Sequence, residues 1–566
     1  MLVFVAALAW RAAFLGRLAA GPLADHLQGD ERIYWDWSSA LLQSRFHATN
    51  PFFLGPLYPY LLAGLRILTG PGIGPVLMVQ SVLGSAAAAL LTDAARRLAR
   101  PAIAVIVGLA FALYGMIVLF DALVLMESTL VCLEVVLLWL LVRTSAGERP
   151  TRAFLALGAV VGLCAECRAT ELLLIVPVAA LALTPGRPTP GRVVRRLVPA
   201  LGACALVVLP AAVWNQRAAH ELIPFTYNFG YNLYVGNNPA ANGEYVDITG
   251  GTAEPVVALG RADGGGATDG REYLQTEEGL ALTPGGSSSL WARRAWAFAR
   301  RRPLLVLALA GRKLLLAWNH DEVTQIESSS LYRQLAGPLG LPVLGTFGFL
   351  GLLGLAGLPW PRAPGADVRT LRLCVVLATA GMLPFFVTDR YRVHLVPGLA
   401  LLAAATLERA LAAWRAGDAR RLRAFAVACA GAGAIVALPI RGDAARREQW
   451  TNLEDVGTRW AEHARTDRAI ACYERALELE RRLGYDRDPD PATARSRALL
   501  AYNYAVALHH EGRDPESLRW FESAVRDDPG EARYVRTLAD AYRASGRARE
   551  ADSTLSRLGG LVGGEA

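Results

Sequence analysis

"ALVLMESTLVCLEVVLLWLLV", residues 122–142, is an almost unbroken apolar run that ends directly before Arg143. A helix of about 20 mostly apolar residues matches the thickness of the hydrocarbon core of a bilayer. Other segments along the chain have the same character. The sequence therefore predicts an all-α polytopic membrane protein with about eleven transmembrane helices, over residues 2–20, 74–95, 101–120, 122–142, 153–166, 170–184, 197–214, 341–358, 371–388, 393–412 and 424–440.

The overall composition is that of a membrane protein. Of the 566 residues, 53% are hydrophobic and 19% are charged, whereas soluble domains are about a quarter charged. Lys313 is the single lysine among 58 basic residues, and the arginines lie between apolar runs instead of forming one basic face. Nucleic-acid-binding proteins carry such a face. The net charge of +8 therefore indicates membrane topology and no nucleic-acid partner.

Arginines gather in five of the loops between the predicted spans, within residues 96–100, 143–152, 187–196, 362–372 and 415–423. With eleven spans, all five loops fall on the same side of the membrane. Loops rich in basic residues face the cytoplasm. The first acidic loop, the long stretch 215–340 and everything after residue 441 are then expected outside. The first span lacks the cleavage site of a signal peptide, so we expect a retained anchor.

Two domains are expected. Residues 1–440 form the membrane domain. Its outer loop (215–340) contains a glycine-rich patch, "ADGGGATDG" (262–270), expected to be flexible. The loop also contains two basic, partly apolar segments, "WARRAWAFARRR" (291–302) and "GRKLLLAWN" (311–319), which predict helices lying along the membrane surface.

Residues 441–566 have a soluble composition and an internal repeat. Gly512 and Gly546 occupy the same position in two similar segments and lie 34 residues apart, the period of the tetratricopeptide helical hairpin. A third copy precedes them, separated by an insertion around "GYDRDPDPAT". Small and aromatic positions of the motif are filled by Ala507, Phe521, Ala524 and Pro529. We expect an extracytoplasmic α-solenoid that presents a binding surface for a protein partner.

Polar residues recur at the outer ends of the predicted spans. The opening loop, "GDERIYWDWS" (29–38), has four acids in or beside it, Asp25, Asp30, Glu31 and Asp36. Charged groups in apolar surroundings are costly and tend to be paired or functional. Others at the same boundary are Asp121, Glu127, Arg168, Glu171, Asp389, Arg390 and Arg392. We find no phosphate-binding loop, zinc-protease motif or nucleophile elbow, and the lone C-x-x-C at Cys164 lacks the second pair that a zinc site needs.

Seven motifs occur in a distinctive order. They are "GDExxYxxWS", "GPLYPYLLAGL", "LMES", a basic residue (Arg168) opening the sixth span, "GYNLYVGNNPxANG", "RKLLLxWN" and "DRYRVHLVP". In this order they resemble the GT-C glycosyltransferases, in particular bacterial relatives of the protein O-mannosyltransferases and of the lipid A aminoarabinose transferases (glycosyltransferase families 39 and 83). The resemblance covers about residues 1–440.

The resemblance implies a bacterial inner-membrane enzyme with an outward-facing active site. Such an enzyme moves a sugar from a polyprenyl-phosphate donor to an acceptor hydroxyl, with inversion. Asp30 matches the first-loop general base, and Glu31 is the acid most easily confused with it. Arg390, Arg392 and Arg168 are expected at the donor phosphate. Further substrate contacts are expected from Tyr34, Tyr58, Glu127, Asn237, Asn238, Asp389 and Tyr391.

Several alternatives stay open. Met126 replaces a proline usual in the family before Glu127, and "RATE" departs from the family pattern after Arg168. Asn237 and Asn238 either line the substrate cleft or cap their loop. No metal or other cofactor is expected. The acceptor is a protein hydroxyl or an envelope glycan or lipid, and the sugar is not specified. A polytopic transporter of a lipid or glycolipid, or a non-catalytic membrane scaffold that presents the repeats, is the alternative function.

Overall fold

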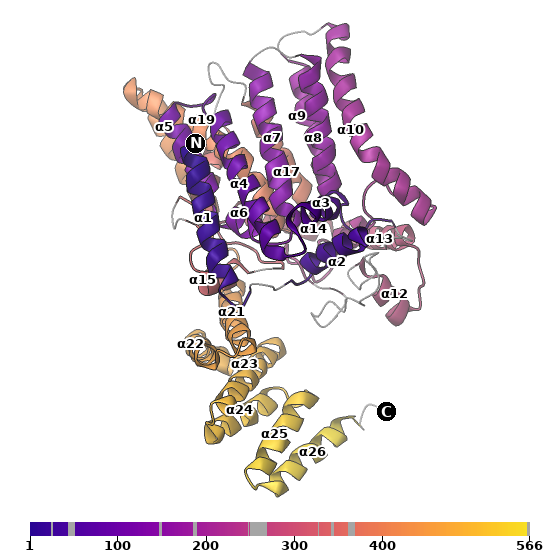
Figure 1. Cartoon of the computed structure of the whole chain (residues 1–566), viewed down its shortest axis with the longest axis vertical. Helices are drawn as coiled ribbons and strands as arrows, with labels where there is room; N and C mark the ends of the chain where they lie inside the picture. Colours follow the sequence, from indigo (N-terminus) through magenta and orange to yellow (C-terminus); the bar gives the residue numbers. More distant parts are fainter. Residues whose placement is uncertain are drawn as a thin grey trace. The chain divides into compact units, whose positions relative to one another are not determined.

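The computed structural model is all-helical over the residues that it describes, which confirms the predicted fold class at that level (Figure 1). The described residues are 1–23, 27–43, 51–146, 150–184, 189–246, 248, 269–326, 328–340, 344–359 and 368–562. Asp25, most of the glycine-rich patch and the first three residues of the predicted span 341–358 lie outside them. Contacts divide the chain into two compact units. The second unit comprises Leu18–His26, Ser330–Gly337 and Arg441–Ala566, and the first unit holds the rest.

The first unit is built from the apolar helices and the outer-loop helices. In chain order they are α1 (Leu2–Ala19), α2 (Asp30–Leu42), α3 (Leu57–Thr69), α4 (Ile73–Ala95), α5 (Pro101–Ala112), α6 (Gly115–Asp121), α7 (Met126–Ala146), α8 (Thr151–Cys167), η1 (Ala169–Leu174), α9 (Ile175–Ala182), α10 (Pro190–Ala219), α11 (Phe229–Val235), α12 (Arg271–Glu278), α13 (Pro284–Arg301), α14 (Pro303–Trp318), α16 (Phe347–Gly357), α17 (Arg369–Met382), α18 (Asp389–Arg392), η3 (Val393–Leu395), α19 (Val396–Arg415) and α20 (Ala419–Val436).

Five helical stretches among the described residues are long and apolar enough to cross a membrane: α1, α4, α7, α10 and the continuous run from α18 through α19. The pair α5–α6 makes a sixth if it is one bent span. Helices also lie at the other predicted positions, but α16 and α17 have only 11 and 14 residues. The count of eleven spans therefore stays a prediction. Figure 1 shows α7, α8 and α10 side by side, with α2, α3 and α13 near one end of them.

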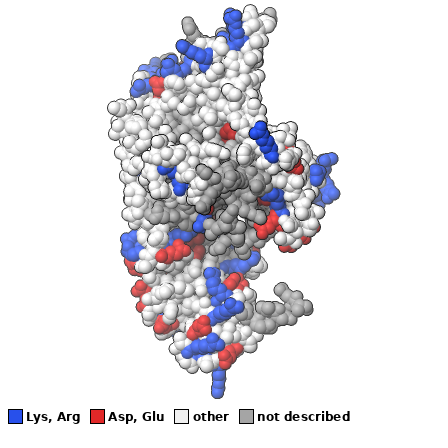
Figure 2. Space-filling view, turned by 45° about the vertical axis from the view of Figure 1, so that its right-hand side comes forward, with Lys and Arg blue, Asp and Glu red and all other residues white. Residues whose placement is uncertain are grey.

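The exposed surface of the first unit suits a bilayer. The outward side chains of α10 include Val194, Val198, Leu201, Leu206 and Leu209, all at least half exposed. Figure 2 shows a broad, largely uncharged face across the upper part of the view. Apolar area of this extent is unusual on a water-facing monomer and is expected where lipid surrounds the protein.

The predicted span over 101–120 is not one straight helix, because the chain bends by 54° between α5 and α6. The break frees carbonyl groups that need partners. Arg11 of α1 donates to the Ala112 carbonyl at 2.7 Å, and it also pairs with Asp121 Oδ2 at 2.7 Å. Ser128 donates to the other carboxylate oxygen of Asp121 at 2.6 Å. Asp121, grouped above with the boundary acids, thus holds the broken helix to α1.

The second unit contains three successive helical hairpins: α21 (Asp443–Glu462) with α22 (Thr466–Leu483), α23 (Pro491–His510) with α24 (Asp514–Asp527), and α25 (Ala532–Ala544) with α26 (Ala548–Val562). The turns of the last two hairpins contain Gly512 and Gly546, with φ of 72° and 73°. Ala464 takes the same left-handed conformation in the first hairpin. Ala507, Phe521 and Ala524 are buried. These features fit the predicted repeat, whose assignment as tetratricopeptide stays a prediction.

Lys313 anchors part of the outer loop. Its ammonium group, on α14, donates to the Leu383 carbonyl at 3.1 Å and to Asn237 Oδ1 at 3.4 Å. The residue is only 1% exposed. Burial disfavours the charged form and lowers the pKa of Lys313 to about 8.

We expect the buried amine to titrate in a single, directly visible step. Since Lys313 is the single lysine, protein grown with isotopically labelled lysine gives one side-chain NMR signal, which should titrate near pH 8. The pKa of a lysine in an unfolded chain is about 10.4. Between these values the unfolded state binds more protons, so the free energy of unfolding should rise with pH through this window. A Lys313→Met variant should lack this rise, and a midpoint above pH 10 would contradict burial.

Candidate active site

Four charged side chains meet where α2, α7, α8 and α18 converge. Arg390 donates from Nη1 to Asp30 Oδ2 at 2.6 Å and from Nε to Glu127 Oε1 at 2.7 Å. Arg168 donates from Nη2 to the same Glu127 oxygen at 3.0 Å and from Nη1 to the main-chain carbonyl of Arg390 at 3.2 Å. These residues come from four of the sequence motifs. We call them the charged cluster.

Burial differs among the members of the charged cluster. The side chain of Glu127 is fully buried, and those of Arg390 and Arg168 are 7% and 10% exposed. Asp30 is the most accessible, with 20% of its side chain exposed. Two carboxylates balance two guanidinium groups. Glu127 therefore contacts both arginines as a buried acid, while Asp30 is the more solvent-accessible of the two acids.

Local sequence explains where the two acids lie. Asp30 is the first residue of α2 and Glu127 the second of α7, and carboxylates are favoured at helix N-termini. The residue before Asp30 is Gly29, with φ of 51°, a conformation that favours glycine. The "GDE" sequence therefore both starts the helix and places Asp30 at its exposed end.

Glu31 differs from Asp30 in its contacts. It is 1% exposed, and its Oε1 accepts a hydrogen bond from the main-chain amide of Val124 at 2.9 Å. Successive residues of a helix point about 100° apart. Glu31 thus ties α2 to the turn before α7, which indicates a structural role instead of the catalytic one considered from the sequence.

Tyr34 and Tyr58 pack edge to face, with ring centroids 5.0 Å apart, and both are fully buried. The Tyr58 hydroxyl donates to Gln80 Oε1 at 2.7 Å. The Tyr34 hydroxyl has no hydrogen-bond partner among the described residues. Tyr34 lies one turn after Asp30 on the same face of α2. Burial, with the carboxylates of Asp30 and Glu127, raises the pKa of Tyr34 well above its usual value, so this hydroxyl stays protonated and can donate.

Tyr34→Phe should therefore change activity without harming the fold. If the hydroxyl donates to a bound substrate, we expect kcat/KM to fall about 10- to 100-fold, as for a lost hydrogen bond to a charged group. Stability should be unchanged or higher, because an unpaired buried hydroxyl costs about 1–3 kcal/mol. Thermal unfolding and turnover of the purified variant measure both. Tyr58→Phe is the control, since it removes a satisfied hydroxyl and should lower stability.

Arg392 lies apart from the charged cluster. It is 1% exposed, and its Nη1 donates to the carbonyls of Asn319 and Asp321 at 2.5 and 2.7 Å. Its Nη2 contacts the carboxylate of Glu322. These contacts engage both terminal nitrogens of Arg392, so the structure gives no support to its predicted contact with the donor phosphate. Asp389 is also internal, because its Oδ1 accepts from the Arg390 amide at 2.8 Å at the start of α18.

The two asparagines cap their loop. Asn237 Nδ2 donates to the carbonyls of Leu233 and Pro384 at 2.8 and 2.6 Å. Asn238 Nδ2 donates to the carbonyls of Tyr234 and Val235, each at 2.9 Å. Of the two possibilities left open by the sequence, the structure supports capping.

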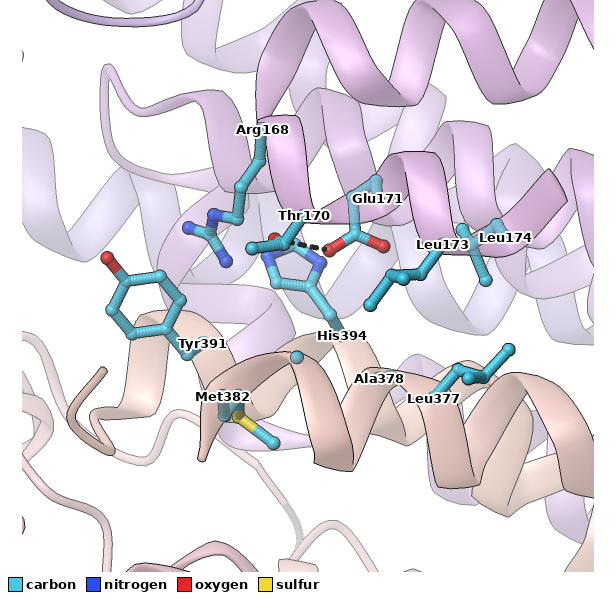
Figure 3. Close-up of a pocket in the computed structure, with 11 residues that line it drawn as sticks. Arg168, Thr170, Glu171, Leu173, Leu174, Leu377, Ala378, Met382, Tyr391 and His394 are labelled. Atoms are coloured by element: carbon cyan, nitrogen blue, oxygen red, sulfur yellow. Dashed lines mark hydrogen bonds between the residues drawn. The ribbon is translucent and has the colours of Figure 1, made fainter. Parts of the chain in front are cut away.

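A small pocket adjoins the charged cluster on the side of Arg168 (Figure 3). The Arg168 guanidinium lies 4.4 Å from the centre of the Tyr391 ring, and Glu171 and His394 face the same space. The His394 Nδ1 is 3.1 Å from Glu134 Oε2. Sequence reasoning missed Glu134 as a member of this polar group. The available signal was its carboxylate, the second one after Glu127 within the apolar run quoted at the outset.

Part of this chain is similar in sequence to a known protein family. A sequence model of the family described as dolichyl-phosphate-mannose-protein mannosyltransferase matches residues 50–214, the part that carries Tyr58, Glu127 and Arg168. No curated protein matches the chain.

Solved structures similar to this chain include an oligosaccharyltransferase and ArnT. The oligosaccharyltransferase of Archaeoglobus fulgidus, solved with zinc and sulfate, has 12% identity and a TM-score of 0.40, over 80% of this chain and 55% of that one. The present chain thus spans about half the length of that protein. ArnT from Cupriavidus metallidurans, bound to undecaprenyl phosphate, has 14% identity and a TM-score of 0.33, over 74% of this chain and 79% of that one.

Proposed function

We propose that this chain is a membrane glycosyltransferase that moves a sugar from a polyprenyl-phosphate donor to an extracytoplasmic hydroxyl, with inversion of the anomeric centre. The charged cluster carries the proposal, because the accessible carboxylate of Asp30 pairs with Arg390, while the buried Glu127 holds both Arg390 and Arg168. An inverting transfer needs a base within reach of the acceptor and cations at the leaving phosphate. The family match over residues 50–214 supports the same class of reaction.

In the proposed step, Asp30 accepts the proton of the acceptor hydroxyl as that oxygen attacks the anomeric carbon. The bond between the anomeric carbon and the phosphate oxygen breaks, and the electron pair leaves with polyprenyl phosphate. A single displacement inverts the anomeric centre. Negative charge disappears from Asp30 and appears on the leaving phosphate in the same event.

Arg390 is suited to this shift of charge. In the resting cluster it is shared between Asp30 and Glu127, and protonation of Asp30 releases Nη1 to the phosphate. Arg168 supplies the second cation. Each guanidinium group can donate two hydrogen bonds to two phosphate oxygens. Glu127 holds both arginines in position before the substrate binds. The site therefore needs little rearrangement as negative charge develops on the phosphate.

We further propose a bacterial inner-membrane location, with the active site and the hairpin unit outside. The acceptor is a protein or an envelope glycan or lipid, and the hairpins act as a tetratricopeptide domain that docks a protein partner. Removal of residues 441–566 with no change in acceptor choice would count against that docking role. No metal is assigned to the reaction.

The test uses membranes with and without the full chain, supplied with undecaprenyl-phosphate hexoses and pentoses labelled in the sugar. We expect chain-dependent release of undecaprenyl phosphate together with labelled product of inverted configuration, detected by mass spectrometry and NMR. Uncleaved donor crossing vesicle membranes would instead identify a transporter. If the donor is neither cleaved nor moved, the proposal is overturned, and a non-catalytic membrane scaffold is the function that remains.

A further inference from the structure

The short helix α18, which carries Arg390, depends on its surroundings for its orientation. It has four residues, Asp389–Arg392. It is the first turn of the continuous run from α18 through α19, so its C-terminal end continues directly into η3, and only its N-terminal end must be held by other segments. The direction in which Arg390 points is therefore set by this continuation together with the contacts that hold the first turn.

One segment, residues 319–325, supplies many of the contacts that hold α18. The Asp389 amide donates to the Val323 carbonyl at 2.8 Å, and Thr388 Oγ1 donates to Gln325 Oε1 at 3.1 Å. At the other end of α18, Arg392 reaches the Asn319 and Asp321 carbonyls and Glu322. We call this segment the α18 cradle. Both ends of α18 rest on it.

The α18 cradle is itself fixed to the rest of the first unit. Asn319 Nδ2 donates to the carbonyls of Val436 and Leu438 at 3.2 and 2.6 Å. Tyr114, at the break between α5 and α6, donates its hydroxyl hydrogen to Glu322 Oε1 at 2.8 Å. Glu322 thus receives Arg392 on one oxygen and Tyr114 on the other, which joins α18 to the broken helix.

Resting on the proposed function, we propose that Glu322 is a positioning residue that aims Arg390 at Asp30 and Glu127. Arg390 and Arg392 are two residues apart on one turn and engage different acids, Arg390 in the charged cluster and Arg392 at the α18 cradle. Locking Arg392 onto Glu322 fixes the rotation of α18 and with it the direction of Arg390. Arg392 then affects the reaction indirectly: it does not contact the substrate, but it fixes the backbone of α18 and so the position of Arg390.

Glu322→Gln should lower kcat by about 10- to 100-fold, since a displacement of about 1 Å at a reacting group can cost that much. Tyr114→Phe should give a smaller loss in the same direction. The matched control is Glu408→Gln, which removes another partly exposed ion pair, with Arg100 at 2.7 Å, and should leave kcat unchanged. A purely structural role for Glu322 would reduce the yield of folded protein but leave kcat per folded molecule intact.

A double-mutant cycle separates positioning from an independent effect. In an Arg390→Lys background, Glu322→Gln should cost less than about threefold, because the group that it aims is already altered. If the two losses multiply in full, Glu322 does not act through Arg390 and the inference is overturned.

A structural readout makes the test independent of the reaction. A cryo-EM structure of Glu322→Gln should show Arg390 Nη1 beyond hydrogen-bond distance of Asp30. If Arg390 stays on Asp30, the positioning role is wrong even where sugar transfer is found. If Arg390 moves but the wild-type chain transfers no sugar from any donor tested, the positioning role stands and the proposed function fails.

Discussion

Asp30→Asn is expected to lower sugar transfer by about 10²- to 10⁴-fold, the usual contribution of a general base. Asparagine keeps the shape of the side chain but cannot take the acceptor proton. It also removes one of the two negative charges beside Arg390, so donor binding should be kept or strengthened. Turnover and binding of undecaprenyl phosphate, measured on the same purified variant, separate the two effects.

Two substitutions on the same helix serve as controls. Asp36→Asn alters a partly buried acid that is not in the charged cluster, and it should leave transfer unchanged. Glu31→Gln weakens the contact with the Val124 amide, and it should lower stability more than turnover per folded molecule. Full activity of Asp30→Asn, or an equal loss in Asp36→Asn, would remove Asp30 from the role of base.

Arg390→Met is expected to abolish transfer and to destabilise the first unit by about 3–5 kcal/mol. The substitution leaves Glu127, which is fully buried, with Arg168 as its remaining cation in the charged cluster, and breaking a buried ion pair on one side has that cost. Thermal unfolding in detergent measures the loss of stability, and binding of undecaprenyl phosphate measures the loss of a phosphate contact.

The double variant Arg390→Met with Glu127→Gln tests the physical reason. Removing the charge on both sides relieves the excess negative charge that Arg390→Met leaves in the charged cluster, so this variant should be more stable than Arg390→Met alone. It should still be inactive, because the cation at the phosphate is missing. If stability recovers together with activity, Arg390 has only a structural role.

Sequence periodicity located most helices but misjudged their lengths. Apolar runs mark where helices lie, since a bilayer or a core requires apolar side chains around the backbone. The break between α5 and α6 was not visible, because the groups that stabilise it, such as Arg11, lie about a hundred residues away in sequence. Whether α16 and α17 span a membrane likewise depends on neighbours that hydropathy does not contain.

The sequence predicted some residues of the candidate site but not the roles of others. The motif order drew attention to Asp30, Glu127, Arg168 and Arg390, and the structure brings these four together. The motif resemblance favoured Asp30 over Glu31, but sequence reasoning could not separate Arg390 from Arg392, because two arginines close together in the chain have the same chemistry. Only side-chain direction distinguishes them.

The sequence by itself determined that this chain is helical and apolar, that its last 126 residues differ in kind, and that charged residues recur at one set of helix ends. These properties follow from composition and from local periodicity. Tertiary structure decided which charges face one another. Ion pairs form between side chains that folding brings within about 3 Å, and Asp30 and Arg390 are 360 positions apart, so no local sequence pattern predicts their contact.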